Sequence, residues 1–230
     1  EETFARALEL APEHYRANLF TVFMPFVRDG DVSRAKAMFE GPWPSWADRS
    51  HWMSWKTPLY ERNYDDALAR VDEWDVEASF WSQGFTPRAS ANGMIYRLAG
   101  QPELAKLQFR TARAQVVKAL ETNPGDVRFR IAFAEVIGGL GDRDAALDEA
   151  RDAIRLMPTS KDAVFGPTIQ LDAVMRVFLP MAAYDLALTE LDAYLAGPGQ
   201  WSIEGLLPDP RLDPVREDPR FQALVEKYRR

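Results

Sequence analysis

The chain has 230 residues, of which 47% are hydrophobic and 27% charged, and its 28 basic and 35 acidic residues leave a net charge of −7. This apolar content suffices for one large domain or two small ones without cross-links. The absence of cysteine excludes disulfides, thiolate metal sites and cysteine nucleophiles, and two histidines leave little room for metal chemistry. The acidic balance argues against nucleic acid as a general partner.

Helical periodicity runs through the whole sequence. Apolar residues recur at spacings of three and four, and the Gly, Pro, Asn and Asp residues fall between the periodic segments. This pattern predicts an all-α fold. The longest apolar run, residues 19–27, is interrupted by Thr21 and Pro25. It falls well short of the ~18 residues that a membrane span needs, so we expect no membrane contact from this segment.

The predicted helices form a series of similar units in chain order. An orphan helix covers residues 1–12, and five turn-and-helix signatures follow, which begin at Gly30, Arg62, Gly100, Gly141 and Ala182. The third unit has a second helix that is longer by about seven residues, or two helical turns, which keeps its apolar face in register. The repeats that contain these signatures are predicted at 16–42, 48–80, 86–124, 127–160 and 168–199.

The unit at 127–160 is the most regular of the series. Gly141 and Asp142 form its turn, small residues such as Ala146 and Ala150 allow its two helices to approach closely, and Pro158 ends it because proline cannot continue a helix. Its length and pattern resemble the tetratricopeptide repeat. The resemblance implies a right-handed α-solenoid of helix-turn-helix repeats over residues 1–199, with a concave groove lined by the first helix of each repeat.

A proline-rich segment ends the sequence at 200–230. Its stretch 207–221, Leu-Pro-Asp-Pro-Arg-Leu-Asp-Pro-Val-Arg-Glu-Asp-Pro-Arg-Phe, resembles the tail of tetratricopeptide arrays in bacterial signalling proteins. Such arrays are attached to adenylate cyclases, serine/threonine kinases or winged-helix regulators. Residues before proline avoid the helical region, so we expect turns here. A short helix over 221–228 is then expected to cap the last repeat.

Placing the repeat on the sequence predicts which side chains face the groove. The apolar members of this set are equally typical of a helix core, and its arginines fit either a cationic stripe for an acidic partner or a solvated helix face. The register of the second repeat allows Trp52 to exchange with Trp55. The predicted groove residues are Phe20, Met24, Trp52, Lys56, Met94, Arg97, Arg128, Glu135, Asp172 and Arg176.

Six tryptophans cluster between residues 43 and 81. Three interpretations remain: they fill irregular space between helices, they form a hydrophobic binding patch, or they line a sugar-binding cleft with nearby carboxylates. His14 and His51 lack metal-ligand spacing and are expected to be surface or capping residues. The tryptophans concerned are Trp43, Trp46, Trp52, Trp55, Trp74 and Trp81.

No catalytic constellation stands out, so the sequence favours a non-enzymatic protein-interaction or scaffold module. The resemblance to signalling arrays implies that this module is part of a larger bacterial signalling or regulatory protein. It would dock a peptide or a neighbouring domain in the concave groove, without cofactor or metal. One alternative is self-association as a homodimer or structural spacer, and a remoter one is a carbohydrate-acting enzyme with an aromatic cleft. The lack of cysteine fits cytoplasm and periplasm alike, with the cytoplasm slightly favoured.

Overall fold

The computed structural model describes residues 2–40, 51–81 and 84–229. Within these ranges the chain is mostly helical, which confirms the predicted helical class. The first half contains α1 (Glu2–Leu10), α2 (Tyr15–Asp29), α3 (Ser33–Glu40), α4 (Trp52–Tyr60), α5 (Tyr64–Asp72), α6 (Arg88–Leu98) and α7 (Pro102–Thr122). The second half contains α8 (Val127–Leu140), α9 (Arg143–Leu156), α10 (Phe165–Ala173), the π-helical turn η1 (Val174–Phe178), α11 (Tyr184–Ala196), α12 (Ile203–Leu206), the 3₁₀ helix η2 (Pro210–Val215) and α13 (Pro219–Tyr228).

Tight turns occur at the five predicted turn signatures, and the residue at which each signature begins adopts a positive φ. Gly141 ends α8 with a φ of 106°, a left-handed conformation that glycine adopts without steric cost. The next residue, Asp142, caps α9 by accepting the backbone N–H of Ala145. Asn63 caps α5 in the same way by accepting the N–H of Asp66. Local sequence therefore accounts for where these helices begin and end.

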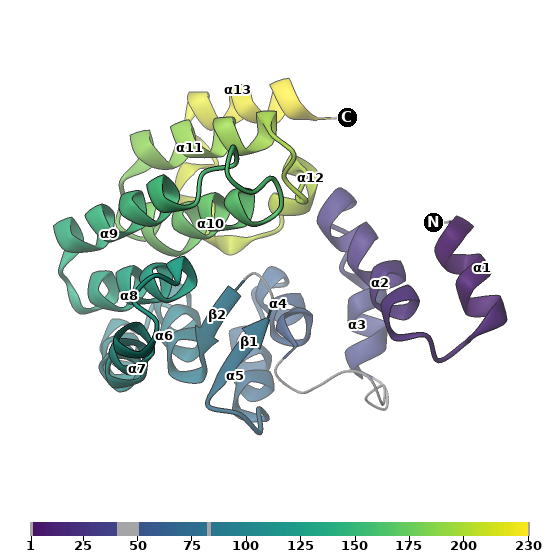
Figure 1. Cartoon of the computed structure of the whole chain (residues 1–230), viewed down its shortest axis with the longest axis horizontal. Coiled ribbons are helices and arrows are strands. Elements are labelled where there is room, and N and C mark those ends of the chain that lie inside the picture. Colours follow the sequence, from purple (N-terminus) through teal and green to yellow (C-terminus); the bar gives the residue numbers. More distant parts are fainter. Residues whose placement is uncertain (1, 41–50, 82–83, 230) are drawn as a thin grey trace.

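The helices follow one another around an arc that returns towards its start (Figure 1). Each packs mainly against its neighbours in sequence, most extensively α8 against α9, α6 against α7, and α7 against α8. The exception is α12, which lies against α2 although the two are far apart in sequence. There the N–H of Ser202 donates to the carbonyl of Val27 at 3.0 Å. The C-terminal part of the chain thus closes the arc.

A short hairpin that the sequence analysis did not anticipate follows α5. Strands β1 (Ala78–Trp81) and β2 (Gly84–Pro87) pair in antiparallel register. The ring of Phe85 in β2 packs edge-on against Phe129 of α8, with 4.8 Å between centroids. Four-residue apolar strands are not distinguishable from helix ends by periodicity, which explains the omission.

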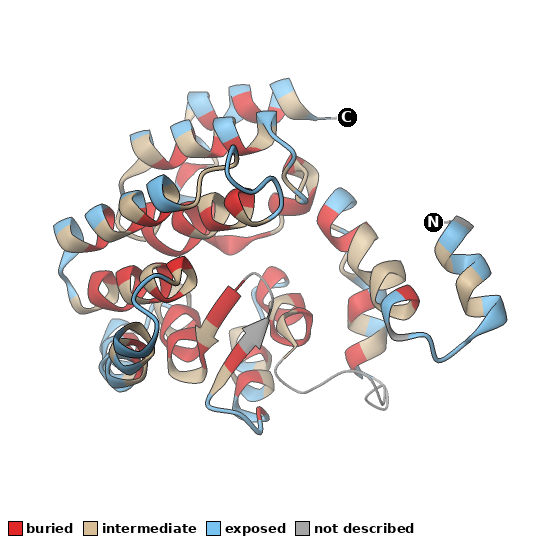
Figure 2. Ribbon diagram, viewed as in Figure 1, coloured by how far each residue is buried: buried red, intermediate tan, exposed pale blue. Residues whose placement is uncertain are grey.

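Burial is concentrated on the inner side of the arc, where α8 and α10 carry many buried residues, whereas exposed residues dominate α7 (Figure 2). The largest apolar cluster joins the helices from α8 to α13. Helix α13 buries Phe221, Leu224 and Val225 and packs against α11, where the hydroxyl of Tyr228 donates to Asp192 at 2.7 Å. None of the described helices is both long and apolar enough to cross a membrane.

Candidate functional site

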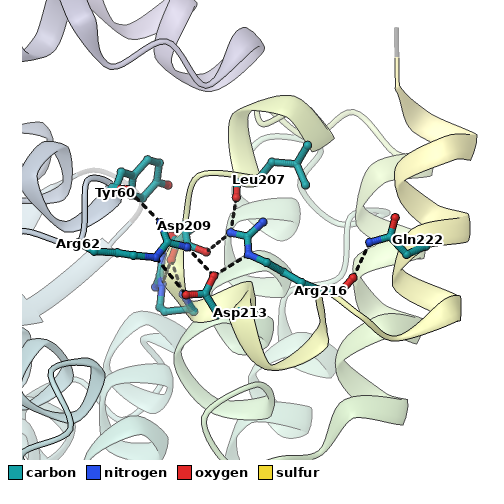
Figure 3. A network of polar contacts seen from close by, with 8 residues as sticks. Tyr60, Arg62, Leu207, Asp209, Asp213, Arg216 and Gln222 are labelled. Carbon is teal, nitrogen blue, oxygen red and sulfur yellow. Dashed lines mark hydrogen bonds and ion pairs between the residues drawn. The ribbon is translucent and has the colours of Figure 1, made fainter.

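The segment 200–216, which we call the return segment, runs along the inner side of the arc. A salt bridge ties it to the turn after α4, since Arg62 Nη2 lies 2.6 Å from Asp213 Oδ1 (Figure 3). Arg216 also contacts Asp213 and donates to the carbonyl of Leu207, which holds the segment in a compact turn. The return segment was expected only as turns, yet it forms one wall of the inner face.

A cavity of about 300 Å³, here called the central cavity, lies between the return segment and helices α2, α4, α10 and α11. Aromatic rings form much of its wall: the centroids of Trp52 and Trp201 lie 5.8 Å apart, and Phe26 packs edge-on behind both at 5.4 and 5.7 Å. The polar residues that line the cavity are His51, Lys56, Tyr60, Thr168, Asp172, Tyr194, Gln200 and Arg211. Aromatic walls with polar groups that converge on the same space are typical of ligand sites.

The ammonium of Lys56 lies among tryptophan rings, and the carboxylates of Asp209 and Asp172 act on it only from beyond ion-pair distance. Its Nζ lies 5.1, 5.8 and 5.6 Å from the ring centroids of Trp52, Trp55 and Trp201, within cation–π range. No hydrogen bond or ion pair joins this Nζ to any residue in the described ranges. Burial, and then the positive charge of Arg211, lowers the pKa of Lys56 to about 8.

Arg211, in contrast, has a dedicated partner. Its Nε and Nη2 donate to the two carboxylate oxygens of Asp209 at 2.9 and 2.5 Å, and both residues are buried. Burial raises the pKa of Asp209, but the guanidinium of Arg211 outweighs this effect and the net shift is downward. Burial and the nearby Asp209 charge raise the pKa of Tyr60 well above 10, so its hydroxyl stays neutral. The charges of Asp209 and Arg211 therefore neutralise each other.

Arg176 joins three parts of the chain beside the cavity. Its Nη2 donates to Glu135 of α8 at 2.7 Å and to the carbonyl of Phe85 in β2 at 3.2 Å, and its Nη1 contacts Asp172 at 3.3 Å. Arg176 and Glu135 are both buried. A buried cation with two carboxylates and a carbonyl is held structurally in place. Arg176 thus contributes to the frame of the site rather than to a free cationic surface.

The predicted groove residues divide into two sets. Phe20, Trp52, Lys56 and Asp172 line the central cavity, so the structure brings these four together. Arg176 and Glu135 lie directly behind Asp172 as a buried ion pair.

The remaining predicted residues lie elsewhere. Met24 lines a separate hollow beside α1, and Met94 is buried in the core between α5 and α6. Arg97 stacks over Phe109 at 5.6 Å, and Arg128 pairs with Asp126 at 2.5 Å. The three predicted arginines therefore do not form a free cationic stripe: Arg97 packs on Phe109, Arg128 pairs with Asp126, and Arg176 is buried in its ion pairs.

Sequence reasoning missed the residues that the return segment supplies, namely Gln200, Trp201, Leu206 and Arg211. One signal was available, because the pattern Asp-x-Arg occurs at 126–128, 209–211 and 218–220. In all three, the aspartate caps a helix and pairs with the arginine two residues later. The pattern does not reveal that one copy is buried.

The tryptophan cluster contains both structural and cavity-facing members. Trp55 and Trp74 are buried, and Trp52 lines the cavity. Trp43 and Trp46 lie outside the described residues, and the side chain of Trp81 does too. Both histidines cap helices, which is one of the two roles predicted for them. His14 Nδ1 accepts a hydrogen bond from the N–H of Ala17, and His51 Nδ1 accepts one from the N–H of Met53.

No protein-family model matches the chain, and the search of curated proteins returns no significant match. Function is accordingly inferred from the geometry of the central cavity.

Proposed function

We propose that this chain is a non-catalytic interaction module, built as a tetratricopeptide-like solenoid within a larger bacterial signalling protein. It docks a peptide or a neighbouring domain on its inner face, at the mouth of the central cavity. One observation carries the proposal: the cavity presents aromatic walls and a lysine whose ammonium has no partner among the described residues. Inner faces of helical arrays suit extended ligands because each helix contributes a few contacts.

The chemistry of the cavity favours binding over catalysis. Asp172 is the single carboxylate among the residues that line the cavity, and it is already paired with Arg176. Glycoside hydrolysis needs two carboxyl groups about 5–9 Å apart, so the described cavity lends that alternative no support.

Occlusion of the cavity tests the proposal. Thr168 lines the cavity from α10, whereas Thr189 is exposed on α11, and each hydroxyl donates to the carbonyl four residues earlier. Thr168→Trp fills the cavity mouth, and Thr189→Trp is the matched control. We expect a partner captured from source-cell lysate by the wild type and by Thr189→Trp to be lost with Thr168→Trp. Equal capture by both variants would place docking elsewhere and contradict the proposal.

Self-association remains a second candidate because α7 exposes two leucines on one face. Leu104 is 43% and Leu107 51% exposed, and their spacing of three places them side by side on the helix. Such a face can bury itself against a second copy in an isologous dimer. Light scattering on the wild type and on Leu104→Glu/Leu107→Glu tests this candidate. A mass unchanged by the substitutions, whether monomeric or dimeric, would exclude that face.

A further inference from the structure

Of the three cations Lys56, Arg211 and Arg176, Lys56 alone has no ion-pair partner among the described residues. Arg211 is neutralised by Asp209, and Arg176 by Glu135 and Asp172, each within 3.3 Å. Lys56 has no carboxylate within ion-pair distance among the described residues. Asp209 and Asp172 attract the ammonium of Lys56 only from beyond ion-pair distance, so its charge is incompletely compensated, and cation–π contacts recover only part of the cost of its burial. An anion that enters the cavity would supply Lys56 with the direct ion pair that the described residues do not provide.

The surroundings of Lys56 restrict which anion fits. Of the described lysine and arginine residues that line the cavity, Lys56 alone lacks an ion-pair partner, and Asp172 faces the same space with a negative charge. A second negative charge on the ligand would therefore meet repulsion rather than a counter-ion. An ammonium offers three hydrogen-bond donors, and tryptophan faces cannot accept them as well as a carboxylate does. The site thus selects a single negative charge over a phosphate dianion.

The walls of the cavity restrict the rest of the ligand. Phe20, Trp52 and Trp201 present apolar rings, and the volume of about 300 Å³ is at the small end of ligand pockets. A ligand body of about one aromatic ring or one large apolar side chain fits this space. A long chain or a disaccharide does not.

We infer that the central cavity binds a monocarboxylate with a compact apolar body, whose carboxylate pairs with Lys56 and whose body lies against Trp52 and Trp201. The inference rests on the proposed function for the location of the site and adds the chemistry of the group that enters it. Two sources supply this chemistry: a free small carboxylic acid, or the C-terminal residue of a partner polypeptide.

Calorimetric titration with a charged and a neutral probe tests the inference. We expect 3-phenylpropanoate to bind the wild-type chain at pH 7 at least tenfold more tightly than 3-phenylpropanamide, which has the same body without the charge. Lys56→Met should abolish this difference while leaving the melting temperature at or above that of the wild type. Lys36→Met, which removes a surface lysine paired with Glu61, is the control and should leave binding unchanged.

Three results would overturn the inference: equal affinity for acid and amide, an acid preference that survives in Lys56→Met, or no binding of the acid by the folded wild type. A Lys56→Arg variant keeps the charge and should keep the acid preference. Loss of that preference in Lys56→Arg would likewise count against the inference, unless the variant has also lost its melting transition, in which case the Lys56→Met comparison decides.

Two further probes separate the sources of the carboxylate. N-acetyl-alanyl-phenylalanine carries a free C-terminal carboxylate, and its amide does not. Tighter, Lys56-dependent binding of this peptide than of 3-phenylpropanoate identifies a chain end as the ligand, whereas binding of the free acid alone identifies a small molecule. Thr168→Trp separates this inference from the proposed function: loss of probe binding with retained partner capture would support the cavity chemistry and contradict docking there.

Discussion

The helix pair α8 and α9 differs from the inner face around α2 and α4 in the origin of its contacts. Between α8 and α9, residues close in sequence meet: Gly141 forms the turn, and Ala146, Ala150 and Ala153 are fully buried against the partner helix. At the inner face, α2 and α4 meet a segment some 150 to 175 residues away, through Val27 with Ser202 and Arg62 with Asp213. Residues close in sequence therefore specify the α8–α9 contacts, whereas the contacts at the inner face join residues far apart in sequence.

The three Asp-x-Arg caps show the same contrast within one motif. Each aspartate accepts the backbone N–H of the arginine two residues later and pairs with its guanidinium. Asp218 and Arg220 do so at the surface, and Asp126 and Arg128 are partly buried, but Asp209 and Arg211 are buried beside the cavity. The same Asp-x-Arg cap therefore lies at the surface or beside the cavity, depending on which parts of the chain pack over it.

The largest expected effect concerns the long-range ion pair of Glu135 and Arg176. Glu135→Gln leaves a buried guanidinium short of one counter-charge, which should cost about 3–5 kcal/mol of unfolding free energy. Glu149→Gln is the matched control, since Glu149 pairs with Arg130 at a partly exposed site and should cost at most about 1 kcal/mol. Urea denaturation measures both. Similar losses of unfolding free energy in the two variants would mean that the Glu135–Arg176 pair stabilises the fold no more than the Glu149–Arg130 pair does.

Closure of the arc depends on a close approach at Gly205. A Cβ atom there would lie 1.9 Å from the carbonyl oxygen of Val27, so Gly205→Ala forces α12 away from α2. We expect a loss of about 2–3 kcal/mol, together with faster proteolysis of the return segment. Gly125→Ala introduces a Cβ with nothing within 4 Å and should change stability by less than about 0.5 kcal/mol. Unchanged stability of Gly205→Ala would show that the arc is open in solution.

The local region is tested by Ala146→Leu. Ala146 is fully buried in the α8–α9 pair, so the larger side chain should overpack it by about 1–3 kcal/mol. Ala193→Leu, at an exposed position of α11, is the control and should have little effect. Thermal unfolding measures the difference. A melting temperature unchanged by Ala146→Leu would contradict the close helix approach.

The smallest effect concerns Lys56. The pKa of Lys56 is about 8 in the folded state, below the 10.5 of a solvent-exposed lysine, so protonation of Lys56 destabilises the folded state relative to the unfolded chain. Stability should therefore rise between pH 8 and pH 10, where the unfolded chain binds the extra proton. Because the Lys56 side chain is only partly buried, we expect less than the full pKa difference implies: Lys56→Met should be more stable than the wild type by about 1 kcal/mol at pH 7, and most of this gain should be lost by pH 10.

Lys36→Met serves as the control for this pH dependence. The hydrogen bond to Glu61 raises the pKa of Lys36, so that lysine stays protonated in both states between pH 8 and pH 10. Denaturant unfolding at pH 7, 8, 9 and 10 gives the comparison. A constant offset between Lys56→Met and wild type across this range would show that Lys56 is not desolvated.

The candidate site was only partly predictable. Phe20, Trp52, Lys56 and Asp172 were identified because a helical repeat assigns each helix one inward face, and they do line the cavity. Arg97 and Arg128 were assigned to that face by the same rule, but they pack on Phe109 and pair with Asp126. The arginine side chain is long enough to reach a nearby partner away from its helix face, and the spacing of apolar residues does not predict such contacts.

By itself, the sequence determined the helices and their turns, because caps such as Asn63 and Asp142, the glycine at 141 and the spacing of apolar residues act within a few residues of the chain. Only the tertiary structure decided that Trp201 and Arg211 would stand opposite Trp52 and Lys56. No local interaction specifies a contact across some 150 residues. Such a contact forms when the packed helices bring the two segments together, and the small residue Gly205 allows their backbones to touch.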